Sequence, residues 1–147
     1  MEMIVAPSLV ILIFTSCVLA SDYYMSSTKS NWTEALDQCE SHGMQLAVID
    51  SPEKQEAIAQ MICSSTVFNE RWTDVWIGAN DIAEEGQFTW QATGENVTYT
   101  NWKLGQPNNY GGKEDCVHVQ YTANVDFQWN DDQCSKKKYF ICEKYCR

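Results

Sequence analysis

The stretch around which this chain is organised reads Gly105-Gln106-Pro107-Asn108-Asn109-Tyr110-Gly111-Gly112-Lys113-Glu114-Asp115-Cys116. It belongs with a second stretch, which reads Trp129-Asn130-Asp131-Asp132-Gln133-Cys134. Both supply carboxylate and amide oxygens and contain no His. Ca²⁺ is a hard cation that prefers oxygen ligands, whereas zinc prefers imidazole or thiolate. Gly and Pro predict that the first stretch is a loop, and a Cys116–Cys134 bridge would hold it near the second. The two stretches therefore predict a calcium site built from two loops.

The length of the chain indicates a single domain, and its charge argues against a nucleic-acid-binding protein. It has 147 residues, which fits one domain, and a formal net charge of -10. An acidic chain is a poor partner for nucleic acid, because phosphate binding needs clustered Lys and Arg. The longest basic run, Lys136-Lys137-Lys138, is interpreted as the solvated lead-in to a strand at 139–142.

Residues 1–20 have the features of a secretory signal peptide. Residues 9–19 are nearly all apolar, and Val18-Leu19-Ala20 is a small-residue cleavage pattern. The segment departs from the usual pattern because it carries Glu2 and no Lys or Arg ahead of the apolar run. A membrane span needs about 20 apolar residues, more than this segment offers. We therefore expect residues 1–20 to be removed and residues 21–147 to form one secreted domain without a membrane span.

The cysteines indicate a disulfide-bonded domain. Of the seven, Cys17 leaves with the expected signal, and an even number remains in a small secreted chain. Six Cys allow many pairings, and the sequence alone does not choose among them. The remaining cysteines are Cys39, Cys63, Cys116, Cys134, Cys142 and Cys146.

Two helices are expected in the first half of the domain. Asn31 is an N-cap for the first, and Glu34 three residues later completes a capping box. Ser51 caps the second, with Pro52 at its first position. Their apolar faces recur at helical spacing. The faces consist of Trp32, Ala35, Leu36 and Cys39 in the first helix, and of Ala57, Ile58, Met61 and Ile62 in the second.

Short strands are expected in the second half, where helical periodicity is lost. Aromatic and β-branched runs bounded by Gly and Asn are typical of strands. Two helices followed by a strand-rich half make an α+β domain. The expected strands are 75–77, 88–90, 101–102, 117–119, 127–129 and 139–142, with 23–25 at the start and an extended run at 46–49.

The order and spacing of several motifs together resemble the C-type lectin-like domain over almost the whole mature length, in the style of single-domain secreted lectins of invertebrates, especially insects. The resemblance implies an α+β fold with two helices, short antiparallel sheets and a long calcium- and sugar-binding loop. The motifs are Cys39, Leu46-Ala47-Val48-Ile49, Trp76-Ile77-Gly78-Ala79-Asn80-Asp81, Glu85-Gly86-Gln87-Phe88-Thr89-Trp90, Asn101-Trp102, Gln106-Pro107-Asn108, Glu114-Asp115-Cys116, Trp129-Asn130-Asp131 and Phe140-Ile141-Cys142-Glu143.

The resemblance also implies pairings and a backbone feature. The family pattern pairs Cys39 with Cys142 and Cys116 with Cys134. That leaves Cys63 to pair with Cys146, or these two to bridge subunits of a homo-oligomer instead. The peptide before the motif's proline, Gln106–Pro107, would be cis.

The implied cofactor is Ca²⁺, which two vicinal hydroxyls of a carbohydrate ligand would help to coordinate. An accessory calcium site is implied beside the main one. The main ligands map onto Gln106, Asn108, Glu114, Asn130 and Asp131, with the Asp131 carbonyl as a further oxygen. The accessory ligands map onto Asp81, Glu85, Asn109, Glu114 and Asp115.

The resemblance implies the sugar preference less directly than it implies the calcium ligands. In the family, Glu-Pro-Asn accompanies mannose-type binding and Gln-Pro-Asp accompanies galactose-type binding, whereas this chain has the mixed Gln106-Pro107-Asn108. Tyr110 lies near where galactose binders place an aromatic ring. We therefore expect a slight preference for galactose, with mannose or fucose as alternatives. Sugar contacts are expected from Tyr110 and the five main ligands.

No enzyme is expected, because His42 and His118 lack a convergent nucleophile and the adjacent acids 131–132 do not form the opposed pair of a glycosidase. Asn31 and Asn96 begin N-glycosylation sequons. The expected role is a secreted lectin that recognises glycans, including those met in innate immunity. The alternative is a lectin-like protein-binding module with structural calcium or none.

Overall fold

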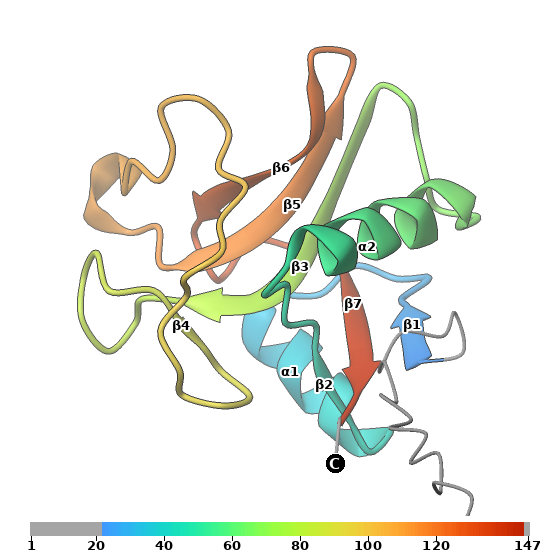
Figure 1. The fold of residues 1–147 in the computed structure, drawn as a ribbon, viewed down its shortest axis with the longest axis horizontal. Helices are drawn as coiled ribbons and strands as arrows, with labels where there is room; N and C mark the ends of the chain where they lie inside the picture. The colour runs from blue at the N-terminus through green and yellow to red at the C-terminus, as the bar shows by residue number, and fades with distance from the viewer. Residues whose placement is uncertain (1–21, 146–147) are drawn as a thin grey trace, which may run out of the picture.

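The computed structural model describes residues 22–145 (Figure 1). The expected signal peptide, Cys17 and Cys146 lie outside the described residues. In chain order the elements are β1 (Tyr23–Met25), α1 (Trp32–Ser41), β2 (Met44–Leu46), α2 (Pro52–Ser64), β3 (Trp72–Asn80), β4 (Thr89–Trp90), a short 3-10 turn at Tyr110–Gly112, β5 (Cys116–Thr122), β6 (Val125–Asp132) and β7 (Tyr139–Lys144). This is the α+β arrangement that the sequence predicts.

Both helices begin at the residues that the sequence predicts. The Glu34 N–H donates to Asn31 Oδ1 at 2.8 Å, and the Asn31 N–H donates to Glu34 Oε2 at 3.1 Å, which forms the capping box of α1. The Lys54 N–H donates to Ser51 Oγ at 3.2 Å at the start of α2. These bonds satisfy N–H groups that a helix cannot pair internally.

The strands pair in the order β1-β7-β3-β5-β6, with β2 also on β7 and β4 also on β3. All pairs are antiparallel except β3 with β7, which is parallel. The strand expected at 101–102 is only a bridge between Trp102 and Trp129. Figure 1 shows the segment between β4 and β5, in yellow and orange, gathered on the side of the molecule opposite β1.

Gly78 allows β3 to lie close to the chain that follows β2. A Cβ at this position would lie 3.0 Å from the Leu46 carbonyl oxygen and 3.2 Å from that of Ala47. The Gly78 N–H donates to the Ala47 carbonyl at 2.9 Å. A side chain here would separate the two segments, because real Cβ contacts are rarely so short.

Trp129 on β6 lies at the centre of the core beneath the long loop. Its ring contacts those of Trp90, Tyr99 and Trp102 at centroid distances of 5.9, 6.0 and 5.6 Å. Its indole N–H donates to Gln55 Oε1 on α2 at 2.8 Å. The loop after β4 is therefore held against the same core as α2 and β6.

Two disulfides lie within the described range, and both are the pairs that the family resemblance implies. Cys39–Cys142 joins α1 to β7, and Cys116–Cys134 joins the start of β5 to the segment after β6. The second bridge brings together the ends of the two stretches that supply the expected calcium ligands.

Cys63 has a free and exposed thiol. Its expected partner, Cys146, lies outside the described residues, so the Cys63–Cys146 pairing and the alternative bridge between subunits stay predictions. Cys63 lies in the last turn of α2 and lines a hollow with Asp126 and Phe127 of β6.

The expectation for Lys138 is corrected, because it is 5% exposed rather than solvated. Its ammonium lies 2.8 Å from Asp132 Oδ2 and 3.4 Å from Asp74 Oδ2. Lys136, which is exposed, contacts Asp132 Oδ1 at 2.6 Å. Lys136 and Lys138 therefore neutralise Asp132, a buried acid at the end of β6, the strand that also carries Asn130 and Asp131.

Candidate calcium and sugar site

Asp131 joins the long loop to β6. Its Oδ1 accepts a hydrogen bond from the Asn108 N–H at 3.1 Å, and its Oδ2 accepts one from the Asn109 N–H at 2.7 Å. The Asp131 side chain is fully buried. The carboxylate thus fixes the loop beside the end of β6, while each oxygen retains lone-pair capacity for a cation.

The loop then folds back on itself, so that Asn108 and Glu114 lie near the same backbone N–H. The Tyr110 N–H lies 2.9 Å from Glu114 Oε2 and 3.2 Å from Asn108 Oδ1. The Glu114 N–H in turn donates to Asn109 Oδ1 at 3.0 Å. The Gln106–Pro107 peptide is cis, as the family resemblance implies.

Two amide oxygens of the expected ligand set are buried without a hydrogen-bond donor anywhere in residues 22–145. They are Gln106 Oε1 and Asn130 Oδ1. Buried polar atoms in folded proteins are normally paired. Together with the carboxylates of Asp131 and Glu114, such amide oxygens make the oxygen-only donor set that Ca²⁺ prefers. The residues present therefore fit a calcium ion.

The electrostatics of Glu114 agree with this fit. Burial raises the pKa of the Glu114 carboxyl, and the nearby carboxylates of Asp131 and Asp132 raise it further, against the Tyr110 N–H, which lowers it. A cluster of buried acids that repel one another favours a bound cation.

A second cluster lies at the accessory position. Oxygens of Asp81, Glu85 and Asp115 all lie within 4.8 Å of one another. Asp81 Oδ2 accepts from the Gly86 N–H at 2.8 Å, but its Oδ1 is buried with no donor among the described residues. Burial, together with the charges of Glu85 and Asp115, raises the pKa of Asp81. These three residues fit a second cation, with Asn109 and Glu114 in the adjoining loop.

His118 contributes to the main site in a way that the sequence analysis missed. It lies opposite Asn130 in the β5–β6 register, and its Nε2 is 3.2 Å from Asn130 Nδ2. Burial lowers the pKa of His118, which keeps the imidazole neutral, and Asp74 Oδ1 lies 3.4 Å from Nδ1. A proton on Nδ1 leaves Nε2 to accept from the Asn130 amide, so Asn130 Oδ1 remains free for a ligand. Only the pairing register of β5 with β6 places His118 opposite Asn130, and the residue types alone do not reveal that register.

The remaining sequence candidates lie on the surface. Tyr110 is 75% exposed on the loop that carries Asn108, where a bound sugar could reach it. Asn96 is exposed and lines a hollow beside Pro107, whereas the oxygen of the Asn31 side chain caps α1.

Comparison with known proteins agrees with this geometry. Residues 28–144 match the Lectin C-type domain. Salivary C-type lectin 1 of Aedes albopictus is 36% identical over 130 residues, which cover 87% of this chain and 85% of that protein. C-type lectin 16 of Aedes aegypti is 38% identical over 117 residues, with 78% and 76% covered. The carbohydrate-recognition domain of the mouse scavenger receptor C-type lectin has a TM-score of 0.72 at 37% identity, with 85% and 90% covered.

The chain therefore belongs to the C-type lectin family. Members of this family are non-enzymatic carbohydrate-binding proteins, so the chain is a lectin and not an enzyme. The family generally binds Ca²⁺. Neither helix within residues 22–145 has the length and apolar character that a membrane crossing requires.

Proposed function

We propose that this protein is a secreted lectin that binds carbohydrate through a Ca²⁺ ion held by its main site. The observation that carries the proposal is the pair of unpaired buried oxygens, Gln106 Oε1 and Asn130 Oδ1, in a ligand set whose acids, Glu114 and Asp131, are also buried. The ion's ligands are Gln106, Asn108, Glu114, Asn130 and Asp131.

When bound, the ion supplies a Lewis-acid centre to which two vicinal hydroxyls of a sugar coordinate. The protein side chains then read the same hydroxyls. The Glu114 carboxylate accepts hydrogen bonds from the sugar O–H groups, whereas the amide N–H groups of Gln106 and Asn108 donate hydrogen bonds to the sugar oxygens. The order of acceptors and donors around the site selects the hydroxyl pair that fits.

Sugar preference depends chiefly on Gln106, which stands where mannose-type members of the family carry a carboxylate. The Gln106 amide offers an N–H donor where a carboxylate would offer only an acceptor, and this favours galactose-type sugars. Asn108, by contrast, is the amide that mannose-type members carry at that position. Tyr110, largely exposed on the same loop, offers a ring for the apolar face of a galactose-type sugar. We assign a slight preference for galactose, with mannose or fucose next.

A single sugar buries little area, so affinity per site is expected in the millimolar range, about -4 kcal/mol. Useful binding therefore requires several copies on one surface or a multivalent glycan. Such binding suits recognition of dense glycans on microbial surfaces, which is the role we assign to the protein. The accessory cluster of Asp81, Glu85 and Asp115 would stabilise the loop with a second Ca²⁺.

The test is retention on galactose-agarose and mannose-agarose in calcium, followed by elution with EDTA. We expect wild-type protein to be retained and released, and Asn130→Ala to pass through. Asn124→Ala, an exposed amide on the β5–β6 hairpin, is the matched control and should behave as wild type. Failure to bind any glycan in calcium would instead favour the lectin-like protein-binding module.

A further inference from the structure

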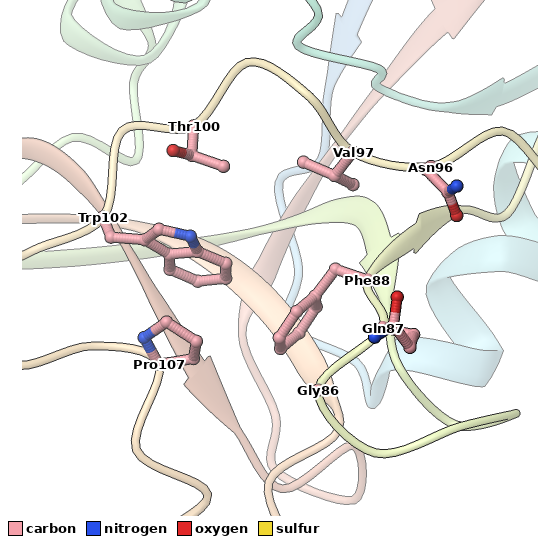
Figure 2. Close-up of a pocket in the computed structure, with 8 residues that line it drawn as sticks. All are labelled: Gly86, Gln87, Phe88, Asn96, Val97, Thr100, Trp102 and Pro107. Carbon is pink, nitrogen blue, oxygen red and sulfur yellow. The ribbon is translucent and has the colours of Figure 1, made fainter.

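A hollow of about 350 Å³ lies beside Pro107. Figure 2 shows the rings of Phe88, Trp102 and Pro107 along one side of it, with Val97 and Thr100 along the other. Phe88 and Trp102 meet edge to face, with centroids 5.1 Å apart. Binding pockets for small molecules are commonly of this size and are lined by aromatic groups with a few polar ones.

This hollow adjoins another one that reaches residues of both proposed calcium sites, including Glu85 and Asn109 of the accessory set. A second hollow of about 240 Å³ shares Gly86, Phe88 and Pro107 with the first and extends to Asn108 and Asp131. A ligand held at the calcium site could therefore continue past Pro107 into the space beside Trp102.

The polar groups of the hollow lack protein partners. Within residues 22–145, neither the Thr100 hydroxyl nor the amides of Gln87 and Asn96 form a hydrogen bond to another residue. The Trp102 indole N–H also finds no protein acceptor there, whereas Trp129 donates to Gln55. Figure 2 shows that nitrogen on the edge of the ring nearest Thr100.

This combination favours a sugar over a hydrocarbon chain. A pyranose has apolar C–H faces that pack on aromatic rings and hydroxyls that pair with amides and an indole N–H. An alkyl chain would cover the same polar groups without pairing them, which is unfavourable.

We propose that the hollow is a second sugar subsite, which binds the pyranose next to the one held at the calcium site. Phe88 and Trp102 contact its apolar face, and Gln87 and Thr100 hydrogen-bond its hydroxyls. The inference rests on the proposed calcium-dependent function. It assigns to Trp102 a ligand contact in addition to its place against Trp129 in the core.

The variant Thr100→Arg tests this subsite. Thr100 is exposed, lines the hollow beside Trp102 and does not line the one that reaches Asp131. The long side chain would fill the mouth without entering the core. Thr66→Arg, at an exposed turn after α2, is the matched control. The proteins are produced in a bacterial periplasm, so that Asn96 carries no glycan.

Two sugar pairs serve as probes: methyl β-galactoside with lactose, and methyl α-mannoside with mannobiose. Affinities in calcium are measured by competition against a sugar-coated surface, and the Trp102 indole N–H is followed by NMR. For the sugar type that binds, we expect the disaccharide to bind about tenfold tighter than the monosaccharide and to shift the Trp102 resonance. Thr100→Arg should abolish that gain and leave monosaccharide affinity within about twofold, while Thr66→Arg retains both.

Monosaccharide binding with no disaccharide gain in the wild type, or a gain that survives Thr100→Arg, would overturn the subsite and leave the proposed function standing. Octyl β-galactoside is run as a further probe: a gain with it and none with the disaccharide would assign the hollow to an apolar aglycone and overturn the sugar subsite too. No calcium-dependent monosaccharide binding at all would overturn the proposed function, and the subsite with it.

Discussion

His118 Nε2 lies 3.2 Å from Asn130 Nδ2, and the two residues face each other across the paired strands β5 and β6. The contact turns the oxygen of the Asn130 amide away from the imidazole and leaves it without a donor among the described residues. A buried histidine on one strand thus orients a proposed calcium ligand on the next.

Replacing His118 should weaken calcium binding before it weakens the fold. In His118→Leu the Asn130 amide has no acceptor and is free to rotate, so we expect calcium affinity to fall about 10- to 100-fold. His118→Gln keeps an acceptor oxygen and should restore most of it. Calcium titration followed by tryptophan fluorescence measures both, with His42→Leu as an exposed control. Equal losses in the Leu and Gln variants would mean that His118 only fills space.

Local chemistry is what the sequence predicted well. The capping pair Asn31 and Glu34 lies within one helical turn, and the order of ligands in 106–108 is a local pattern. The structure contains the capping box, and it contains the cis Gln106–Pro107 peptide that the family resemblance implies. Such features need no knowledge of which strands pair.

Long-range features were not predictable in the same way. The His118–Asn130 contact depends on the β5–β6 register, and the burial of Lys138 depends on Asp74, which lies 64 residues earlier in the chain. In each case the deciding partner is distant in sequence, so composition and periodicity gave no signal.

Asp74 should govern the acid stability of the sheet. Burial alone would raise the pKa of the Asp74 carboxyl, but the Nδ1–H of neutral His118, the charge of Lys138 and a hydrogen bond from Trp72 bring that pKa well below its ordinary value. A carboxyl with a lower pKa in the folded state binds its proton less tightly there than in the unfolded chain. Ionised Asp74 therefore stabilises the fold above its unfolded pKa of about 4, and this stability is lost as the pH falls toward the folded pKa.

Urea unfolding at pH 7, 4 and 3 measures that effect. We expect Asp74→Asn to lose about 2–3 kcal/mol at pH 7, because Lys138 and Trp72 lose a charged partner. Its stability should then fall less steeply with acid than that of the wild type. Asp126→Asn, at an exposed carboxylate, is the control. A wild-type slope in Asp74→Asn would contradict the assignment.

The two disulfides should separate stability from calcium binding. Cys39–Cys142 spans 103 residues, and removing it should lower the free energy of unfolding by about 4–5 kcal/mol in the chain-entropy model. Cys116–Cys134 spans 18 residues, and the corresponding loss is about 3 kcal/mol.

Calcium affinity should depend more on Cys116–Cys134 than on Cys39–Cys142, which is the reverse of the order expected for stability. Cys116 and Cys134 flank the two ligand-bearing stretches, so their double Ala variant should lose about tenfold in calcium affinity, as supporting residues of metal sites commonly do. Removing Cys39–Cys142 should change it less than about twofold, since α1 and β7 carry no ligand. Denaturant unfolding without calcium and calcium titration at 10 °C provide the two readouts. Equal effects on calcium affinity would show that the second bridge has no particular role at the site.

Gln106 is the residue at which affinity and specificity should change together. Gln106→Glu adds a carboxylate to the ligand set. The additional negative charge should tighten calcium binding about tenfold. The substitution also replaces a donor by an acceptor, so sugar preference should move from galactose toward mannose. Asn108→Asp is the matched change: it adds the same charge but completes Gln-Pro-Asp, and should move preference further toward galactose. Calcium titration and inhibition by methyl β-galactoside and methyl α-mannoside measure the two effects separately. If both variants tighten calcium binding and neither alters the ratio of the two inhibition constants, specificity must lie outside residues 106 and 108, with Tyr110 the next residue to replace.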